Sequence, residues 1–429
     1  MERIAVIGSG IAGLAAAREM TRGPGARRVV LFEAAAHFGG HANTVDVTLD
    51  GVAHGVDTGF LVYNERTYPR LVRLFAELDV ETAASDMSFS VQVRGRGLEW
   101  SGSNLAGVFS QRGNVLRPAF WRMLADIARF NRLAAGIAQR GEAAVLEQAI
   151  GVFLDEHRFG REFREWYFLP MIGCIWSCPS AQMLAFPVAT LIRFCHNHGL
   201  LQVTDRPQWM TVRGGSRHYV RRIVSRLEDA RLNMPVLGVK RVEAGALIST
   251  ASGVEHFDQV VFACHSDQAL RLLGADATPA EAQVLGAIRY HPNHAVLHTD
   301  ASLLPASRSA WAAWNYESTN SASEAGVCLH YLLNRLQPLP WAQPVLVSLN
   351  PVREPRAETV IRRFDYDHPV FDLGAIAAQL RLPEIQGQRR TWYCGAWVGH
   401  GFHEDGVSAG LAAAQALIQA SRVVQRGAA

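Results

Sequence analysis

The sequence predicts an α/β fold that begins with a Rossmann-like domain for binding a dinucleotide. Three neighbouring features support this prediction: an apolar run at 3–7 that is rich in β-branched residues, the glycine motif GSGIAG at 8–13, and helix-forming residues from Leu14 to Arg18. A strand, a tight turn and a helix in this order form the phosphate-binding unit of such domains. A glycine-rich turn in an ordinary α/β domain is the alternative.

The glycine motif predicts a cradle for a pyrophosphate. Gly8 permits the tight turn, Gly10 lets the backbone approach the phosphates, and Gly13 lets the helix pack on the strand. The start of the helix, at Ile11 and Ala12, offers free N–H groups and the positive end of the helix dipole. We therefore predict that these five residues contact the cofactor.

A second strand and an acidic residue strengthen the prediction. Residues 28–32 form another apolar run that ends in Glu33, which lies 20 residues past Gly13. This is the separation expected of an acid that binds a ribose hydroxyl, and Ala34 follows it directly. Strand, glycines, helix, second strand and acid in register are more specific than a glycine motif alone.

Length and composition limit the class of protein. A chain of 429 residues exceeds the usual size of a single core, so we expect two or three domains, with interleaved segments allowed. The net charge of +3 gives no support for nucleic-acid binding, and none is expected. The six cysteines form no C-x-x-C pair, which is typical of buried thiols in a reducing compartment.

We expect a cytoplasmic protein. The first strand starts at Arg3, which leaves no room for a signal peptide, and no window approaches 18 uninterrupted apolar residues. Peripheral contact with the inner membrane remains open.

A second glycine pair and a hairpin follow Glu33. The run FGGHANT covers 38–44, and alternating runs at 45–49 and 52–56 are separated by Asp50-Gly51, which is a hairpin signal. The residues Asp57-Thr58-Gly59 come next, followed by an expected helix over 67–78.

These motifs, in this order, resemble the superfamily of flavin-dependent amine oxidases and phytoene desaturases. The resemblance implies FAD as cofactor, with Gly39 and Gly40 beside its pyrophosphate and with Thr58 and Gly59 also at the site. An arginine usually follows the glycine pair in that superfamily, whereas this chain has His41. An imidazole is neutral near pH 7 unless its site raises its pKa, so this phosphate contact is expected to be weaker.

Later segments extend the resemblance. A strand over 392–394 ends in Gly395, and residues 401–407 lead into a helix of small residues at 408–417, which resembles the C-terminal flavin motif. The resemblance implies that Gly406 and Val407 lie at the flavin and that the last helix points at its pyrimidine edge. It also implies that the backbone near Val236 meets the adenine. Relatives carry an acid after the glycine to bind the ribitol, but this chain has Ala396.

The middle of the chain has a different character. We predict a discontinuous FAD-binding domain and an α+β substrate domain made of a mixed sheet and a helical region. The first comprises 1–84, 203–286 and 386–429, and the second comprises 85–202 and 287–385. Large apolar residues at 166–176 and 185–195 form either plain core or the walls of an apolar tunnel. Cys174 and Cys178 lie four apart and are expected on one helical face, which permits a metal pair, but no further ligands accompany them. We predict core thiols and no metal site.

Apolar residues at helical spacing over 116–137 predict a basic amphipathic helix within 117–140. Its arginines form either a solvated face or a patch that docks on anionic lipid. They are Arg117, Arg122, Arg129, Arg132 and Arg140.

A closer resemblance concerns a bacterial group of NAD/FAD-binding, amine-oxidase-like proteins that is commonly associated with cyclopropane-fatty-acid-synthase-type lipid methyltransferases. The residues that carry it are 56–69, 85–90, 175–179, 207–209 and 403–406. The association implies modified fatty acyl chains without naming a reaction.

We therefore expect an FAD-dependent oxidoreductase of the desaturase or dehydrogenase type, which transfers a hydride from an apolar, fatty-acyl or lipid substrate to flavin N5. No second G-x-G-x-x-G motif supplies a site for NADPH. Candidates for a general base are His403, Glu404 and Tyr63; in each case a capping, dipole or packing role is the alternative. A redox-neutral isomerase or hydratase, a non-catalytic lipid carrier and an amine oxidase remain as other interpretations.

Overall fold

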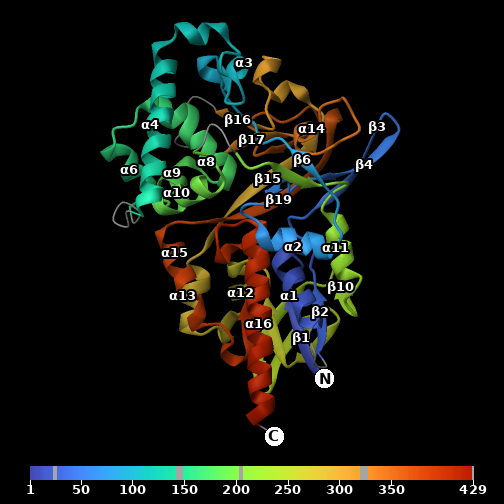
Figure 1. The fold of residues 1–429 in the computed structure, drawn as a ribbon. Helices are drawn as coiled ribbons and strands as arrows, with labels where there is room; N and C mark the ends of the chain where they lie inside the picture. Colours follow the sequence, from blue (N-terminus) through green and yellow to red (C-terminus); the bar gives the residue numbers. More distant parts are fainter. Residues whose placement is uncertain (23–26, 142–147, 202–205, 319–326, 428–429) are drawn as a thin grey trace.

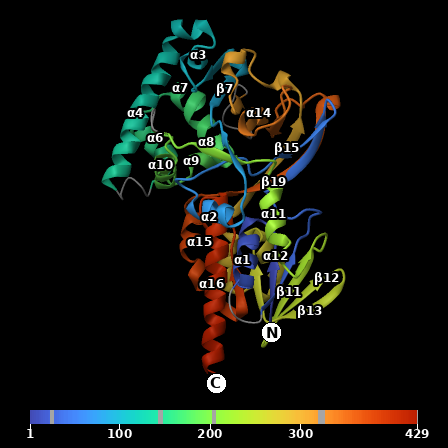
Figure 2. The same ribbon diagram turned by 45° about the vertical axis from the view of Figure 1, so that its right-hand side comes forward.

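The chain forms two regions, each built around its own β-sheet (Figure 1). The computed structural model describes residues 1–22, 27–141, 148–201, 206–318 and 327–427. Both chain ends lie in the region with the parallel sheet, and the helices of the middle segment surround the other sheet (Figures 1 and 2). None of the described helices combines the length and apolar character that crossing a bilayer requires.

The first region contains a five-stranded, wholly parallel sheet. Its strands in spatial order are β10 (Asp229–Arg231), β2 (Arg27–Phe32), β1 (Glu2–Ile7), β14 (Gln259–Phe262) and β20 (Thr391–Tyr393). Alternate side chains of one strand enter two different cores: Ile4 and Val6 pack on one face, and Ala5 and Ile7 on the other. Because both faces are covered, the strand sequences are nearly continuous apolar runs.

Different elements cover the two faces of the parallel sheet. The first core lies under α1 (Ile11–Arg22), α2 (Pro69–Glu77), α11 (Arg217–Val224) and α16 (His403–Gly427). The second core lies under the antiparallel strands β11 (Val236–Val242), β12 (Gly245–Thr250) and β13 (Gly253–Phe257), together with α12 (Ser266–Leu273), α13 (Pro279–Gly286) and α15 (Leu373–Leu380).

The second region contains a seven-stranded mixed sheet in which β16 and β7 form the one parallel pair among the described strands. Its order is β19 (Val360–Val370), β15 (Arg289–His298), β18 (Leu346–Leu349), β17 (Cys328–Leu332), β16 (Trp314–Ser318), β7 (Phe89–Val93) and β8 (Leu98–Ser101). Helices on one side of this sheet share its largest apolar core. They are α4 (Pro118–Arg140), α6 (Ile150–Glu156), α7 (Arg161–Phe163), α8 (Leu169–Trp176), α9 (Ser180–Leu184) and α10 (Val188–Asn197).

Shorter elements connect the two regions. The predicted hairpin is confirmed as β3 (Thr44–Leu49) and β4 (Val52–Asp57), with Asp50 and Gly51 at positive φ in its turn. A small sheet joins β5 (Tyr63–Asn64), β9 (Trp209–Val212) and β6 (Thr82–Ser85). Strand β15 also reaches the parallel-sheet region, where the hydroxyl of Tyr290 accepts a hydrogen bond from the Ser266 amide at 3.0 Å.

The expected α/β class is confirmed, and the long helix predicted within 117–140 is present as α4. The expectation that Cys174 and Cys178 share one helical face is wrong. Helix α8 ends at Trp176, and Ser177 takes the left-handed conformation. The Cys178 thiol instead contacts the Trp176 carbonyl at 3.2 Å, and both cysteines are buried.

Candidate active site

One cavity of about 760 Å³ draws its lining from both regions. Its nucleotide end contains Glu33, Val236 and the turn from Gly8 to Gly10. Other lining residues come from the start of α16 and from the helices and strands that surround the mixed sheet. A single cavity therefore joins the predicted nucleotide cradle to an apolar compartment.

The three motif glycines play different structural roles. A Cβ at Gly13 would lie 2.0 Å from the Gly8 carbonyl oxygen, so Gly13 permits the close packing of α1 on the turn. Gly8 has a φ of +105°, and a Cβ there would lie 2.9 Å from the Ala263 carbonyl oxygen. A Cβ at Gly10 meets no atom within 4 Å, and Gly10 lines the cavity. The space beside Gly10 is therefore available to a ligand.

Ser9 joins the two glycine-rich loops, although the sequence motif did not single it out. The Glu33 carboxylate accepts hydrogen bonds from the Ser9 amide at 3.0 Å, from the Ser9 hydroxyl and from the Ala35 amide at 2.8 Å. The Gly39 amide donates to the Ser9 hydroxyl oxygen at 3.1 Å, and Gly10 pairs with Gly39 as a parallel bridge. These contacts hold Glu33 and the two glycine-rich loops together. The predicted residues Ala34, Gly40 and Gly59 line the same cavity.

Three histidines line the cavity beside these loops: His41, His265 and His368. The rings of His41 and His368 are 5.3 Å apart, and the Nε2 atom of His41 is buried without a partner among the described residues. Burial and the neighbouring imidazoles lower the pKa of His41 well below its usual value, and mainly burial lowers the pKa of His368 to about 4. A ligand oxygen would satisfy the orphaned His41 nitrogen.

The segment after β20 supplies Gly395, Ala396 and Trp397, at the same carboxyl end of the parallel sheet as the Gly8 turn, and the start of α16 supplies His403. The His403 ring stacks on Phe60 with centroids 3.7 Å apart, and its Nε2 atom lies 3.1 Å from the Tyr219 hydroxyl. Burial lowers the pKa of His403 to about 3, so this imidazole is neutral near pH 7.

Several predicted site residues do not line the cavity. Glu404 accepts hydrogen bonds from the amides of Arg70 and Leu71, at 3.1 and 2.9 Å, and so caps the start of α2. The Tyr63 ring packs edge-on against Phe75 and Tyr68. The Thr58 hydroxyl lies 2.8 Å from the Tyr366 hydroxyl.

Gly406 and Val407 also lie behind the cavity wall. A Cβ at Gly406 would lie 2.6 Å from Cγ2 of Ile11, so this glycine sits where α16 meets α1. Val407 is buried in the core between these helices.

The substrate-domain end of the cavity is apolar. Asp367, on β19 of the mixed sheet, lines the cavity near His265. The described lining side chains from the helices, from β7, β16 and β17 and from the segments beside them carry no charge. They are Met87, Phe89, Met171, Cys174, Ile175, Ser177, Phe194, Leu200, Trp314 and Tyr331. The sequence predicts either plain core or a tunnel wall for the aromatic middle segment. Four of its residues, Met171, Cys174, Ile175 and Phe194, combine both roles because they pack in the core and line the cavity.

The model for flavin-containing amine oxidoreductases matches residues 11–298. The chain belongs to this family. Its cofactor is FAD, and the residues of the cavity fit that group. Two glycine-rich loops and the anchored Glu33 line it. A Cβ at Gly10 would meet no protein atom, and Nε2 of His41 is buried without a partner among the described residues.

Several solved structures share the fold along almost the whole chain. Cyclohexylamine oxidase from Brevibacterium oxydans IH-35A is 16% identical with a TM-score of 0.69, covering 98% of this chain and 99% of its own. The fatty acid isomerase from P. acnes is 14% identical with a TM-score of 0.67, covering 97% and 98%. Reduced UDP-galactopyranose mutase is 15% identical with a TM-score of 0.66, covering 98% and 96%. No curated protein matches the sequence.

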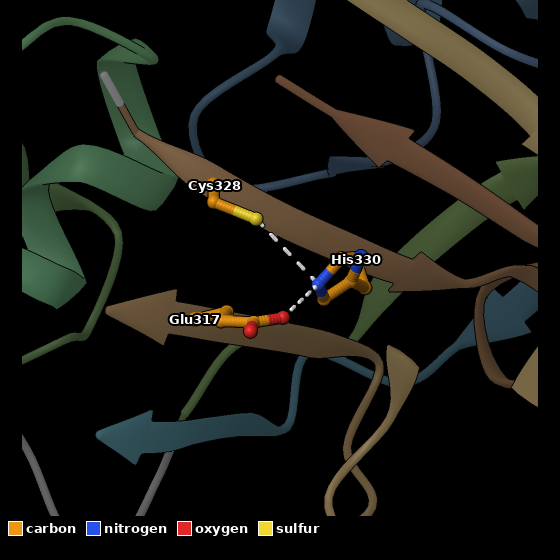
Figure 3. Close-up of side chains that lie close together, drawn as sticks. All are labelled: Glu317, Cys328 and His330. Carbon is orange, nitrogen blue, oxygen red and sulfur yellow. Dashed lines mark hydrogen bonds and ion pairs between the residues drawn. The ribbon is translucent and has the colours of Figure 1, made fainter. Parts of the chain in front are cut away.

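A second group of titratable residues lies on the neighbouring strands β16 and β17 (Figure 3). Strand alternation places this group on the opposite sheet face from Trp314 and Tyr331, which line the cavity. The Glu317 carboxylate accepts hydrogen bonds from Arg94 and from His330, whose Nε2 lies 2.9 Å away. Possible ligand atoms of Glu317, Cys328 and His330 lie within 4.8 Å of one another. This group could not be predicted from the sequence, because it forms through the pairing of β16 with β17.

The chemistry of this group favours a hydrogen-bonded network over a cation site. Burial alone would raise the pKa of Glu317, but the hydrogen bonds from His330 and Arg94 outweigh it and hold that pKa below its usual value. Burial raises the pKa of Cys328 to about 12, which keeps it a thiol. Because Arg94 already compensates the carboxylate, a metal ion would add a second positive charge, and the expectation of no metal centre stays a prediction.

Proposed function

We propose that the protein oxidises an apolar, fatty-acyl or lipid-type substrate in a desaturase or dehydrogenase reaction. The observation that carries the proposal is the uncharged lining of the substrate-domain end of the cavity. Burial of an acyl chain there releases about 25 cal/mol per Å² of apolar surface, whereas an ammonium group among these side chains would lose its hydration and find no carboxylate partner among them. Asp367, which also lines the cavity, lies near His265.

The FAD group, when bound, supplies a hydride acceptor at N5. The residues of the chain then have separate tasks. The glycine loops and Glu33 hold the nucleotide, and the aromatic residues at the other end exclude water and fix the acyl chain. The substrate loses one hydrogen as a hydride and a second as a proton, which leaves a carbon–carbon double bond.

His403 is our candidate for the proton acceptor, because it alone of the three predicted bases lines the cavity. Its neutral imidazole carries one unprotonated ring nitrogen, but the pKa of about 3 makes it a weak base. Orientation by Tyr219 and Phe60 suits this role because both groups restrain the ring.

A redox-neutral reaction is the second candidate. The fold is shared with a fatty acid isomerase and with a mutase, and the apolar cavity suits an unsaturated acyl chain as well as a saturated one. The flavin would then serve without net reduction. Oxidation of an apolar amine is a third possibility for the same cavity.

The test is anaerobic incubation of the purified holoprotein with acyl lipids, followed by flavin absorbance and product mass. Oxidation predicts bleaching of the flavin and a product lighter by two hydrogens. An unchanged mass, or addition of water, with the flavin still oxidised would replace the proposal by the isomerase or hydratase. A colourless protein that binds lipid without turnover would favour a carrier and contradict both.

A further inference from the structure

An exposed apolar surface flanked by arginines lies at the end of the molecule opposite the C-terminus (Figures 1 and 2). It is formed by α3 (Leu105–Val108), the 3₁₀ turn Arg112–Leu116 and the first turn of α4. Leu116 is 84% exposed, Leu105 78%, Trp121 49% and Val115 46%. We call these four residues, together with Arg112 and Arg117, the α3–α4 patch.

The fold holds these apolar side chains in the exposed position. The indole N–H of Trp121 donates to the Val115 carbonyl at 2.9 Å, and the Trp121 ring lies 5.8 Å from that of Phe109. Asn114 is buried, and its amide donates to the Glu99 carbonyl at 3.1 Å, which anchors the turn. Grouped leucine and tryptophan side chains on a fixed surface mark an interaction site, because soluble surfaces seldom keep such groups together.

The charges near the patch are positive. Residues 100–125 include Arg112, Arg117 and Arg122 and no aspartate or glutamate. Arg122 pairs with Glu162 at 2.6 Å, whereas neither Arg112 nor Arg117 forms an ion pair with any residue that the structure describes. The two acids that flank this stretch are engaged elsewhere, Glu99 by the amides of Ala306 and Ser307 and Asp126 by Arg129. Two arginines therefore remain available beside the apolar groups.

The middle of α4 is less suited to bind anions. Arg129 pairs with Asp126 at 2.9 Å and also donates to the His157 carbonyl at 2.8 Å. Arg132 is exposed and has no ion-pair partner among the described residues, but no large apolar side chain described on α4 after Trp121 is exposed, so available cations and apolar groups occur together at the beginning of this helix.

We propose that the α3–α4 patch docks the protein on an anionic lipid bilayer. Tryptophan and leucine enter the interfacial layer, while Arg112 and Arg117 contact lipid phosphates. The inference goes beyond the proposed reaction and does not depend on it, because the patch lies outside the cavity lining.

The experiment is co-sedimentation of the holoprotein with phosphatidylcholine vesicles that contain or lack phosphatidylglycerol. The test variant is Leu116→Asp with Arg117→Gln. The matched control is Leu380→Asp with Arg381→Gln, which changes the net charge equally at another leucine that is 79% exposed. Arg381 differs in that it pairs with Glu384 at 2.9 Å. Flavin content verifies that each variant is folded.

We expect binding to vesicles with phosphatidylglycerol, weaker binding at high salt, and about a tenfold loss in the patch variant alone. Failure of the flavin-loaded wild-type protein to sediment with anionic vesicles would overturn the proposal. Equal binding by the patch and control variants would also overturn it, because the attraction would then come from overall charge. Neither result bears on the flavin bleaching experiment.

Discussion

The nucleotide end of the cavity contains two glycine-rich loops from one segment of the chain, whereas the substrate end is lined by large side chains from α8, α10 and the mixed sheet. Contacts within the first 39 residues hold the two loops together, such as Ser9 with Glu33 and Gly10 with Gly39. The substrate end joins residues as distant as Met87 and Tyr331. The glycine cradle thus depends on contacts within one short segment, to which the fold adds Val236, His265 and His368, whereas the substrate end depends entirely on the packing of remote segments.

The largest expected effect concerns two glycines at the nucleotide end: Gly10 borders the space for the cofactor, and Gly13 lies where α1 packs on the turn. Gly10→Val should give a folded protein without flavin, because the added side chain enters the space beside the loops without meeting protein atoms. Gly13→Val should lower the free energy of unfolding by about 3 kcal/mol or more, because its Cβ would clash with the Gly8 carbonyl. Flavin content and urea denaturation measure the two effects. Normal flavin in the Gly10 variant would refute the assigned cradle.

A charge placed at the substrate end should leave flavin binding intact but slow the reaction with lipid. Ile175→Arg is expected to retain flavin but to slow lipid-dependent flavin bleaching at least about a hundredfold, because an unpaired guanidinium opposes entry of an acyl chain. Ile175→Leu is the control and should bleach within a few-fold of wild type. If the arginine variant loses flavin as well, the two ends are not independent.

Proton uptake should accompany FAD binding at the nucleotide end. The cavity holds the pKa of His41, His265 and His368 below the usual histidine value, and a pyrophosphate beside His41 would raise them again. Raising a pKa on binding means that affinity increases as pH falls and is lost as pH rises through the raised value. One fully linked proton changes Kd about tenfold per pH unit.

Calorimetry of the apoprotein with FAD in two buffers of different ionisation enthalpy measures this uptake. His41→Arg should bind FAD with less proton uptake and a flatter pH dependence, since arginine stays charged. His256→Gln is the control, because His256 is exposed and does not line the cavity. A pH-independent Kd for the wild type would exclude a titrating phosphate contact.

The smallest expected effect concerns Glu404, which follows the cavity-lining residue His403 in the sequence but does not line the cavity itself. Glu404→Ala should lower stability by about 1 kcal/mol, because α2 loses the acceptor for two amides at its start. Flavin bleaching by lipid should stay unchanged, and Glu404→Gln should recover much of the stability. A fall of about a hundredfold or more in bleaching with the alanine variant would instead make Glu404 a base.

The sequence predicted those parts of the fold that depend on residues close together in the chain. Gly8, Gly10, Gly13 and Glu33 belong to one strand–turn–helix–strand unit, and the hairpin turn at Asp50 depends on two residues. The family resemblance added the distant loops at Gly39, Val236 and Gly395, all of which line the cavity or its rim.

The remaining site residues could not be predicted, because their positions depend on side-chain direction and strand register. His403 and Glu404 are adjacent on α16, so they point about 100° apart, one into the cavity and the other toward α2. His368 reaches the cavity through the pairing of β19 with β15, where His291 faces His368, and that register cannot be read from either strand alone. The unpaired arginines and the exposed leucines of the α3–α4 patch likewise depend on which neighbours the fold supplies.

The contact between α16 and α1 has a consequence for biosynthesis. A Cβ at Gly410 would lie 2.2 Å from the Ala12 carbonyl, so the last helix of the chain rests directly on the first. Gly395, Trp397 and His403 line the cavity together with the loop at Gly8. The complete cavity therefore requires residues that the ribosome adds more than 380 positions after that loop.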